Sequence, residues 1–267
     1  MANLLDRNCL PIGDFFTQVA LGGFPGITKH HLGALAYGIP NNGPFTLWGD
    51  NTLYTYPTSA VSVNSLSIAS ASANDTVAGT GARKVKITGL DTNYAAVTET
   101  VSMNGQTPVK LTEEFYRINE MSVYEIGSSL YNIGDVWLGT GTFTAGVPAT
   151  KYSLILNETN VSENGIFTVP ASHYAMIFPP AVSFGFYDGE ATVSVLQKEN
   201  RANAAFEHIF TILTNPTHPR GGDGQKLFPE KTEFQVQVNS CASTPDIALE
   251  SCIFLIEQSF FDNPDRR

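Results

Sequence analysis

The sequence predicts an all-β protein made of two antiparallel, jelly-roll-like β-sandwich units that follow an extended N-terminal arm. Residues 61–68 and 83–90 alternate between apolar and polar side chains, as half-buried strands do. Tight-turn pairs such as Asn104-Gly105 and Asp188-Gly189 separate strand candidates at short intervals. Helical character is limited to residues 200–209 in the second half and to a possible short helix at 14–21, so antiparallel strands are expected to form the core.

Residues 1–55 form the expected arm, because they are rich in glycine, proline and aromatic residues and show no sustained period. Such an arm packs on its own domain or laces into a neighbouring subunit, and the sequence leaves both options open. The aromatic residues of positions 15–56 are the candidate inter-subunit contact. They are Phe15, Phe16, Phe24, Tyr37, Phe45, Trp48, Tyr54 and Tyr56.

Residues 56–146 form the expected first unit. Residues 83–90 and 94–103 read as two strands joined by the turn sequence Gly89-Leu90-Asp91-Thr92-Asn93, and Asn104-Gly105 signals a further hairpin. Strands are also expected at 115–126 and 135–144, with turns at 127–128 and 132.

Residues 147–267 form the expected second unit. Its strand candidates are 152–156, 166–169, 173–177, 182–186, 191–197, 207–213, 233–238 and 248–259. Residues 214–226 read as a loop projecting from the end of the sandwich, with Pro216, His218, Arg220 and Asp223 as its candidate contact residues.

Composition excludes several functional classes. The chain has 267 residues, of which 42% are hydrophobic, so it can bury a full core. Only 15% are charged, and the net charge of −10 with no basic run argues against direct nucleic-acid binding. No window is apolar enough for a membrane helix, and the first residues do not read as a signal peptide.

The three cysteines, Cys9, Cys241 and Cys252, are too few and too scattered for a disulfide scaffold or a zinc site. Cys241 and Cys252 could pair if their strands are neighbours. Free thiols in a protein assembled in a reducing cytoplasm are the simpler expectation.

The histidines do not form a metal-binding pattern. His30 and His31 are adjacent in an extended segment, so their side chains should point to opposite faces. His173 follows an apolar run and reads as a strand residue, whereas His218 in the loop could meet a ligand or lie in a surface turn. No metal ion or cofactor is expected.

The carboxylates do not predict an enzyme either. Glu113-Glu114 and the pair Asp188 and Glu190 are adjacent or alternate, and sequence cannot place them across a glycosidase cleft. The glycine-rich stretch 221–224 lacks the context of a phosphate loop. We therefore expect no catalytic residues.

Residues 79–109 carry a family resemblance. The string GTGARxVxIxGLDxNYxxxxETVxxNGxTPV, present at 79–109, resembles a module of virion structural proteins of tailed phages, especially marine and cyanobacterial ones, and of algal viruses. The similarity extends upstream to Trp48 and to Tyr56-Pro57-Thr58-Ser59-Ala60, and downstream to 115–119, 132–135, 166–171 and 228–232, and so covers roughly residues 45–258.

The resemblance implies a virion structural protein, made in the host cytoplasm and found in the virion. A capsid decoration or minor capsid accessory protein is the first reading, with the major capsid protein or tail proteins as partners. A tail, baseplate or head-fibre component that binds a host receptor or glycan through sandwich loops is the alternative. Assembly as a homo-oligomer, with a trimer as one option, suits either role.

Overall fold

The structure, a computed structural model, describes residues 18–19, 22–40, 43–57, 66–178, 180–184, 191–201, 204–214, 217–220, 226–241, 244 and 246–262. The described chain is almost entirely β, with antiparallel pairing throughout the named strands, and a one-turn helix α2 (Ser259–Asp262) follows the last strand. The all-β, antiparallel part of the prediction is confirmed.

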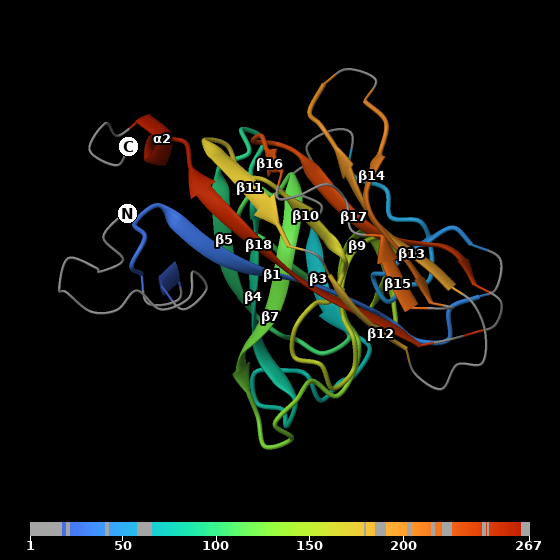
Figure 1. The fold of residues 1–267 in the computed structure, drawn as a ribbon. Helices are drawn as coiled ribbons and strands as arrows, with labels where there is room; N and C mark the ends of the chain where they lie inside the picture. The colour runs from blue at the N-terminus through green and yellow to red at the C-terminus, as the bar shows by residue number, and fades with distance from the viewer. Residues whose placement is uncertain are drawn as a thin grey trace.

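Four antiparallel sheets build the part of the chain that the structure describes (Figure 1). Sheet one contains β1 (Ile27–Ala36), β18 (Ile247–Glu257), β11 (His173–Ile177), β16 (Leu227–Phe228) and β12 (Ala181–Phe184). Sheet two contains β10 (Ile166–Thr168), β17 (Glu233–Cys241), β13 (Ala191–Lys198), β14 (Glu207–Thr214), β15 (Thr217–Arg220) and β2 (Phe45–Thr46). Sheet three contains β6 (Val109–Lys110), β3 (Ser67–Ser70), β8 (Val136–Thr144) and β9 (Val147–Ile155). Sheet four contains β5 (Ala96–Ser102), β4 (Ala82–Leu90) and β7 (Arg117–Ile126).

The sheets form four separate blades rather than the predicted two sandwiches in succession. Two large hydrophobic clusters lie among them, and each draws its side chains from two blades. One joins sheets one and two, with Phe228, Phe234 and Leu249 among its buried members. The other joins sheets three and four and includes Ile68 and Ile87.

The predicted boundaries at residues 55 and 146 are not boundaries of these sheets. Residues 27–36, expected in the arm, form β1 and pair along their whole length with β18, next to which β1 runs in Figure 1. The boundary at 146 falls inside the β8–β9 hairpin, where Ala145 and Gly146 have φ of 48° and 84°. Positive φ at two successive residues is typical of a hairpin turn, so β9 belongs with the first half of the chain.

The hairpin expected at residues 83–103 is confirmed: β4 pairs with β5 from Lys84–Ser102 to Leu90–Ala96. The prediction of a second hairpin at Asn104-Gly105 is wrong. Gly105 has a φ of 60°, but β5 pairs with β4 while the following β6 pairs with β3. The turn therefore moves the chain from one sheet to another.

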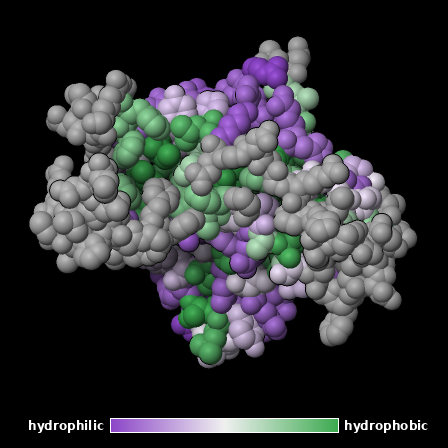
Figure 2. Space-filling model, viewed as in Figure 1, coloured by the Kyte–Doolittle hydropathy of each residue, from purple (hydrophilic) through white to green (hydrophobic). Residues whose placement is uncertain are grey.

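Figure 2 shows hydrophilic and hydrophobic side chains mixed on this face, with hydrophobic ones gathered toward the upper left. Isolated exposed apolar side chains such as Leu130, 73% exposed, are ordinary on a folded protein. None of the described helices is long and apolar enough to span a membrane.

We predict that β1 is part of the core. Leu32 is 2% exposed within the cluster of sheets one and two, so Leu32→Ala should lower the free energy of unfolding by about 2–4 kcal/mol. Leu53, 51% exposed, is the matched control, and Leu53→Ala should change stability by less than about 0.5 kcal/mol. Chemical denaturation measures both. Equal effects of the two substitutions would show that β1 contributes nothing to the core.

Candidate functional site

The turns of residues 72–81, 104–105 and 132–135 meet around one buried carboxylate. Asp75 is fully buried, and its Oδ1 accepts hydrogen bonds from the backbone N–H groups of Ala82 and Ile133 at 2.7 and 3.0 Å. Its Oδ2 accepts from Ser70 Oγ and from Gly134 N–H at 2.6 and 2.9 Å. A buried carboxylate with four donors is well satisfied, so it fixes the turn of 72–81 relative to that of 132–135. The turn of 104–105 joins them through Gly105 N–H, which donates to the backbone carbonyl oxygen of Asp75 at 2.8 Å.

Gly81 is required at this network because a Cβ there would overlap Asp75 Oδ1. The resemblance residues Gly79-Thr80-Gly81-Ala82, Asn104-Gly105 and Asn132-Ile133-Gly134-Asp135 all lie in or beside these turns. They therefore serve the frame of sheets three and four. Nothing in the sequence marked Asp75 as its centre.

A second set of resemblance residues lies where sheet four meets sheet two. Arg117 on β7 forms an ion pair with Glu233 on β17, with Nη2 at 2.6 Å and Nε at 3.0 Å from Glu233 Oε1. The two side chains are only 5% and 6% exposed. Arg117 Nη1 also donates to the carbonyl oxygens of Pro57 and Tyr116. Burial acts to lower the pKa of Arg117, but the charge and hydrogen bonds of Glu233 outweigh it and raise that pKa.

Aromatic rings enclose this ion pair. The guanidinium carbon of Arg117 lies 3.9 Å from the ring centre of Tyr116, 5.3 Å from that of Tyr56 and 5.8 Å from that of Tyr94. Tyr56 Oη donates to the carbonyl oxygen of Phe234 at 2.6 Å, which ties the ring to β17. Burial, above all, raises the pKa of Tyr94 to about 12, so the ring stays neutral beside the cation. The pair is thus desolvated and held by cation–π contacts.

Asn119 adds a second contact between sheet four and sheet two, and this contact region, with the Arg117–Glu233 pair, is called the joint below. The β4–β7 register shifts between Thr88 and Gly89, which leaves Asn119 as an extra residue opposite no partner. Its side chain instead accepts from Thr168 N–H at 2.9 Å and donates to Thr168 C=O at 3.0 Å. A bulge of this kind re-aims a side chain. Here it lets sheet four bond the backbone of β10.

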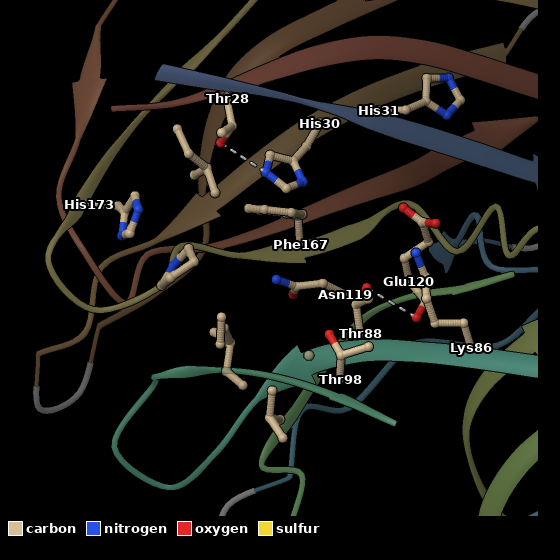
Figure 3. A pocket seen from close by; sticks show the side chains of 16 residues that line it. Thr28, His30, His31, Lys86, Thr88, Thr98, Asn119, Glu120, Phe167 and His173 are labelled. Carbon is tan, nitrogen blue, oxygen red and sulfur yellow. Dashed lines mark hydrogen bonds between the residues drawn. The ribbon is translucent and has the colours of Figure 1, made fainter. Parts of the chain in front are cut away.

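A groove opens beside this joint, with a volume of about 390 Å³ (Figure 3). One wall comes from β1 and β11, and the other from the outer face of β4, β5 and β7. Phe167 lies at its base, with its ring centre 5.6 Å from that of His30. The polar residues that line the groove are Thr28, His30, His31, Lys86, Thr88, Thr98, Asn119, Glu120 and His173.

His30 on β1 and His173 on β11 lie at the points where the buried faces of these strands continue into the walls of the groove. Going backward along β1, the inward face reads Ala36, Ala34, Leu32 and then His30, and that of β11 reads Ile177, Ala175 and then His173. The pKa of His30 is lowered by burial and, to a smaller extent, by His173. His31 lies on the opposite side of β1 from His30 in Figure 3, as predicted for neighbours in a strand.

The predicted aromatic contact surface is not supported by where its residues lie. Trp48, Tyr54 and Tyr56 are 4%, 7% and 8% exposed, and they stack edge to face in a small cluster of their own. Phe45 packs against the cluster of sheets one and two, and Phe24 packs in a cluster beside β18. Tyr37 is 52% exposed. Phe15 and Phe16 lie outside the described residues.

The predicted projecting loop is partly a strand. Residues 217–220 form β15, which pairs back onto β14 and places His218 opposite Leu213 and Arg220 opposite Thr211. Pro216 and Asp223 lie outside the described residues. The proline and glycine content of this stretch suggested a loop, but residues 217–220 pair antiparallel with β14.

The metal ligands, cysteines and paired carboxylates considered from the sequence do not come together as a site within the described residues. These contain no group of three or more histidine, cysteine or carboxylate side chains arranged for a metal ion. Cys241 ends β17 and Cys252 lies in β18, strands of different sheets, so the condition for their pairing on neighbouring strands is not met. Glu113 and Glu114 are exposed, and the backbone N–H of Glu113 donates to the carboxylate of Glu99 in a surface turn.

No family model matches this chain, and no curated protein or solved structure matches it either.

We predict that Asp75 fixes the turn frame. Asp75→Asn places an amide NH₂ where backbone donors converge, so the free energy of unfolding should fall by about 3 kcal/mol. Asp91→Asn is the control, because Asp91 Oδ1 also accepts two backbone N–H groups, but in an exposed turn. Thermal and urea unfolding compare the two. A loss in Asp75→Asn no larger than in Asp91→Asn would contradict this role.

We predict strong coupling between Arg117 and Glu233. Arg117→Met leaves Glu233 buried with only Lys198, 3.4 Å away, and should cost about 3–5 kcal/mol. The double variant Arg117→Met/Glu233→Leu should recover much of that loss, because no buried charge is left unpaired. Lys84→Met, which breaks an exposed pair with Glu125, is the control and should have little effect. A double-mutant cycle that shows no coupling energy between Arg117 and Glu233 would contradict a buried ion pair at the joint.

We predict a pH dependence from His30. Its folded pKa lies below 6.5, so at acid pH the unfolded chain binds this proton more readily than the folded one. The contribution of His30 is therefore fully present above pH 6.5 and is lost as the pH falls through the folded value. His30→Asn should flatten the stability curve below pH 6.5, whereas His31→Asn, at an exposed position, should keep the slope. Urea unfolding from about pH 5 to pH 7.5 tests it; identical slopes in the native protein and His30→Asn would refute it.

Proposed function

We propose that this chain is a non-enzymatic structural protein of a virion, a capsid decoration or minor capsid accessory protein. The observation that carries the proposal is where the resemblance residues lie: around Asp75 and at the Arg117–Glu233 joint, as parts of a frame. Two networks that lock loops and sheets together suit a protein whose task is to hold a shape. Its partners would be other virion proteins and further copies of itself.

Contact with such partners is better assigned to sheet faces and edges than to the aromatic residues of the predicted arm. Trp48, Tyr54 and Tyr56 are already buried within the chain and have little surface left for a neighbour. A surface with few charges also suits broad contacts, because charged side chains are depleted in the core of protein interfaces.

A second role, as a tail, baseplate or head-fibre component that recognises a host receptor or glycan, is favoured by the groove beside the joint. A concave, polar site is not required for a decoration protein that works through flat sheet faces. The two roles share a virion location and differ in copy number and position.

Cryo-EM of purified particles, combined with quantitative mass spectrometry of this chain, tests the proposal. Many copies spread over the shell are expected for a decoration protein. A few copies at the tail or a single vertex would favour the second role instead. Absence of the chain from purified, infectious particles would overturn both.

A further inference from the structure

We propose that the groove between β1, β11 and the outer face of β4, β5 and β7 is a binding site for a neutral sugar residue. This inference deepens the second role proposed above, since it names the ligand class of the same groove, and its failure would leave the decoration role untouched. At about 390 Å³, the groove lies within the range of about 300–1,000 Å³ typical of ligand sites.

The groove concentrates hydrogen-bonding groups that have no protein partner. Within the described part of the chain, Lys86 Nζ, the Glu120 carboxylate and Thr98 Oγ1 make no hydrogen bond or ion pair, and all three residues line the groove. Figure 3 shows Lys86, Glu120 and Thr98 on one wall, across from His30 and His173 on the other. Polar groups held at a concave site with unused bonding capacity are what a polar ligand requires.

The two histidines add one vacant ring nitrogen each. His173 Nδ1 lies 2.8 Å from the carbonyl oxygen of Ala171 and therefore donates to it, which leaves Nε2 as an acceptor. His30 Nε2 lies 3.2 Å from Thr28 Oγ1, and its Nδ1 meets no hydrogen-bond partner among the described residues. Both residues stand on inward faces that are otherwise apolar, where packing alone would favour a hydrophobic side chain.

The charges of the groove balance, which points to an uncharged ligand. Lys86 and Glu120 contribute one charge of each sign, and burial keeps His30 neutral near pH 7. A phosphate or carboxylate ligand would call for an excess of cations. A sugar hydroxyl both donates and accepts, so it matches a wall that mixes ammonium, carboxylate, hydroxyl and imidazole groups. Ala96, which shares the outer face of β5 with Thr98, provides an apolar contact for the C–H face of a sugar ring.

NMR titration of the full-length protein tests the site directly. The probes are the methyl glycosides of glucose, galactose, mannose, fucose, N-acetylglucosamine and N-acetylgalactosamine, each at up to about 50 mM. A ligand of roughly a dozen non-hydrogen atoms should bind with about millimolar affinity. We expect at least one sugar to give saturable shifts in residues of β4, β5 and β11. No saturable binding by any of the six would overturn the proposal.

Two variants on one strand locate the binding. Thr98→Val removes a groove hydroxyl and should weaken sugar binding at least about fivefold. Thr100→Val, two residues along the same strand but outside the groove lining, should leave the affinity unchanged. Equal effects of the two variants would overturn the assignment to this groove. Inorganic phosphate or glucuronate that competes for the same residues with higher affinity would overturn the choice of a neutral sugar.

Discussion

The buried ion pair between Arg117 and Glu233 is the constraint on which the arrangement of the sheets depends. Its partners are 116 residues apart in the chain, so the Arg117–Glu233 pair forms only when sheet four has docked against sheet two. Removing two charges from water is costly, and their attraction offsets that cost only when the geometry is good and further hydrogen bonds complete it. Tyr116, Tyr56 and the carbonyl oxygen of Pro57 supply these contacts. The pair therefore contributes orientation between sheets more than net stability.

A fixed joint also sets the width of the groove beside it. Arg117 and Asn119 are two residues apart on β7, and Glu120, next in the chain, lines the groove. Because Asn119 is bonded to the backbone of Thr168 through both polar atoms, β7 cannot slide relative to β10 without breaking two hydrogen bonds. The walls that carry Glu120 and His30 thus keep their separation. A site between rigid sheets is better preorganised than one built on loops.

The sequence could predict contacts between residues that are close in the chain, and it could not predict contacts between distant segments. Alternation over 83–90, with turn residues after it, was enough for the β4–β5 hairpin, because hairpin pairing depends on neighbours in the chain. The pairing of β1 with β18 joins residues about 220 positions apart, and no local pattern encodes it. The aromatic residues near 48–56 were read as an exposed surface, since composition does not show that three rings stack on one another. Asp75 had no signal, because three of its four donors are backbone N–H groups, which every sequence has.

In the pattern at residues 79–109, the specified positions and the open positions fall on different parts of the structure. The specified ones include structural positions, and the open ones include the outer face of β4 and β5. The pattern's specified positions include Gly81, whose lack of a side chain makes room for Asp75, and Val85 and Ile87, which point into the core. Its open positions include Lys86, Thr88 and Thr98, which share the outer face of β4 and β5 and line the groove. In an antiparallel sheet with one buried face, core packing restricts only alternate residues. A module of this construction can keep its fold while the chemistry of its outer face changes, which is the property expected of a scaffold that carries a binding site.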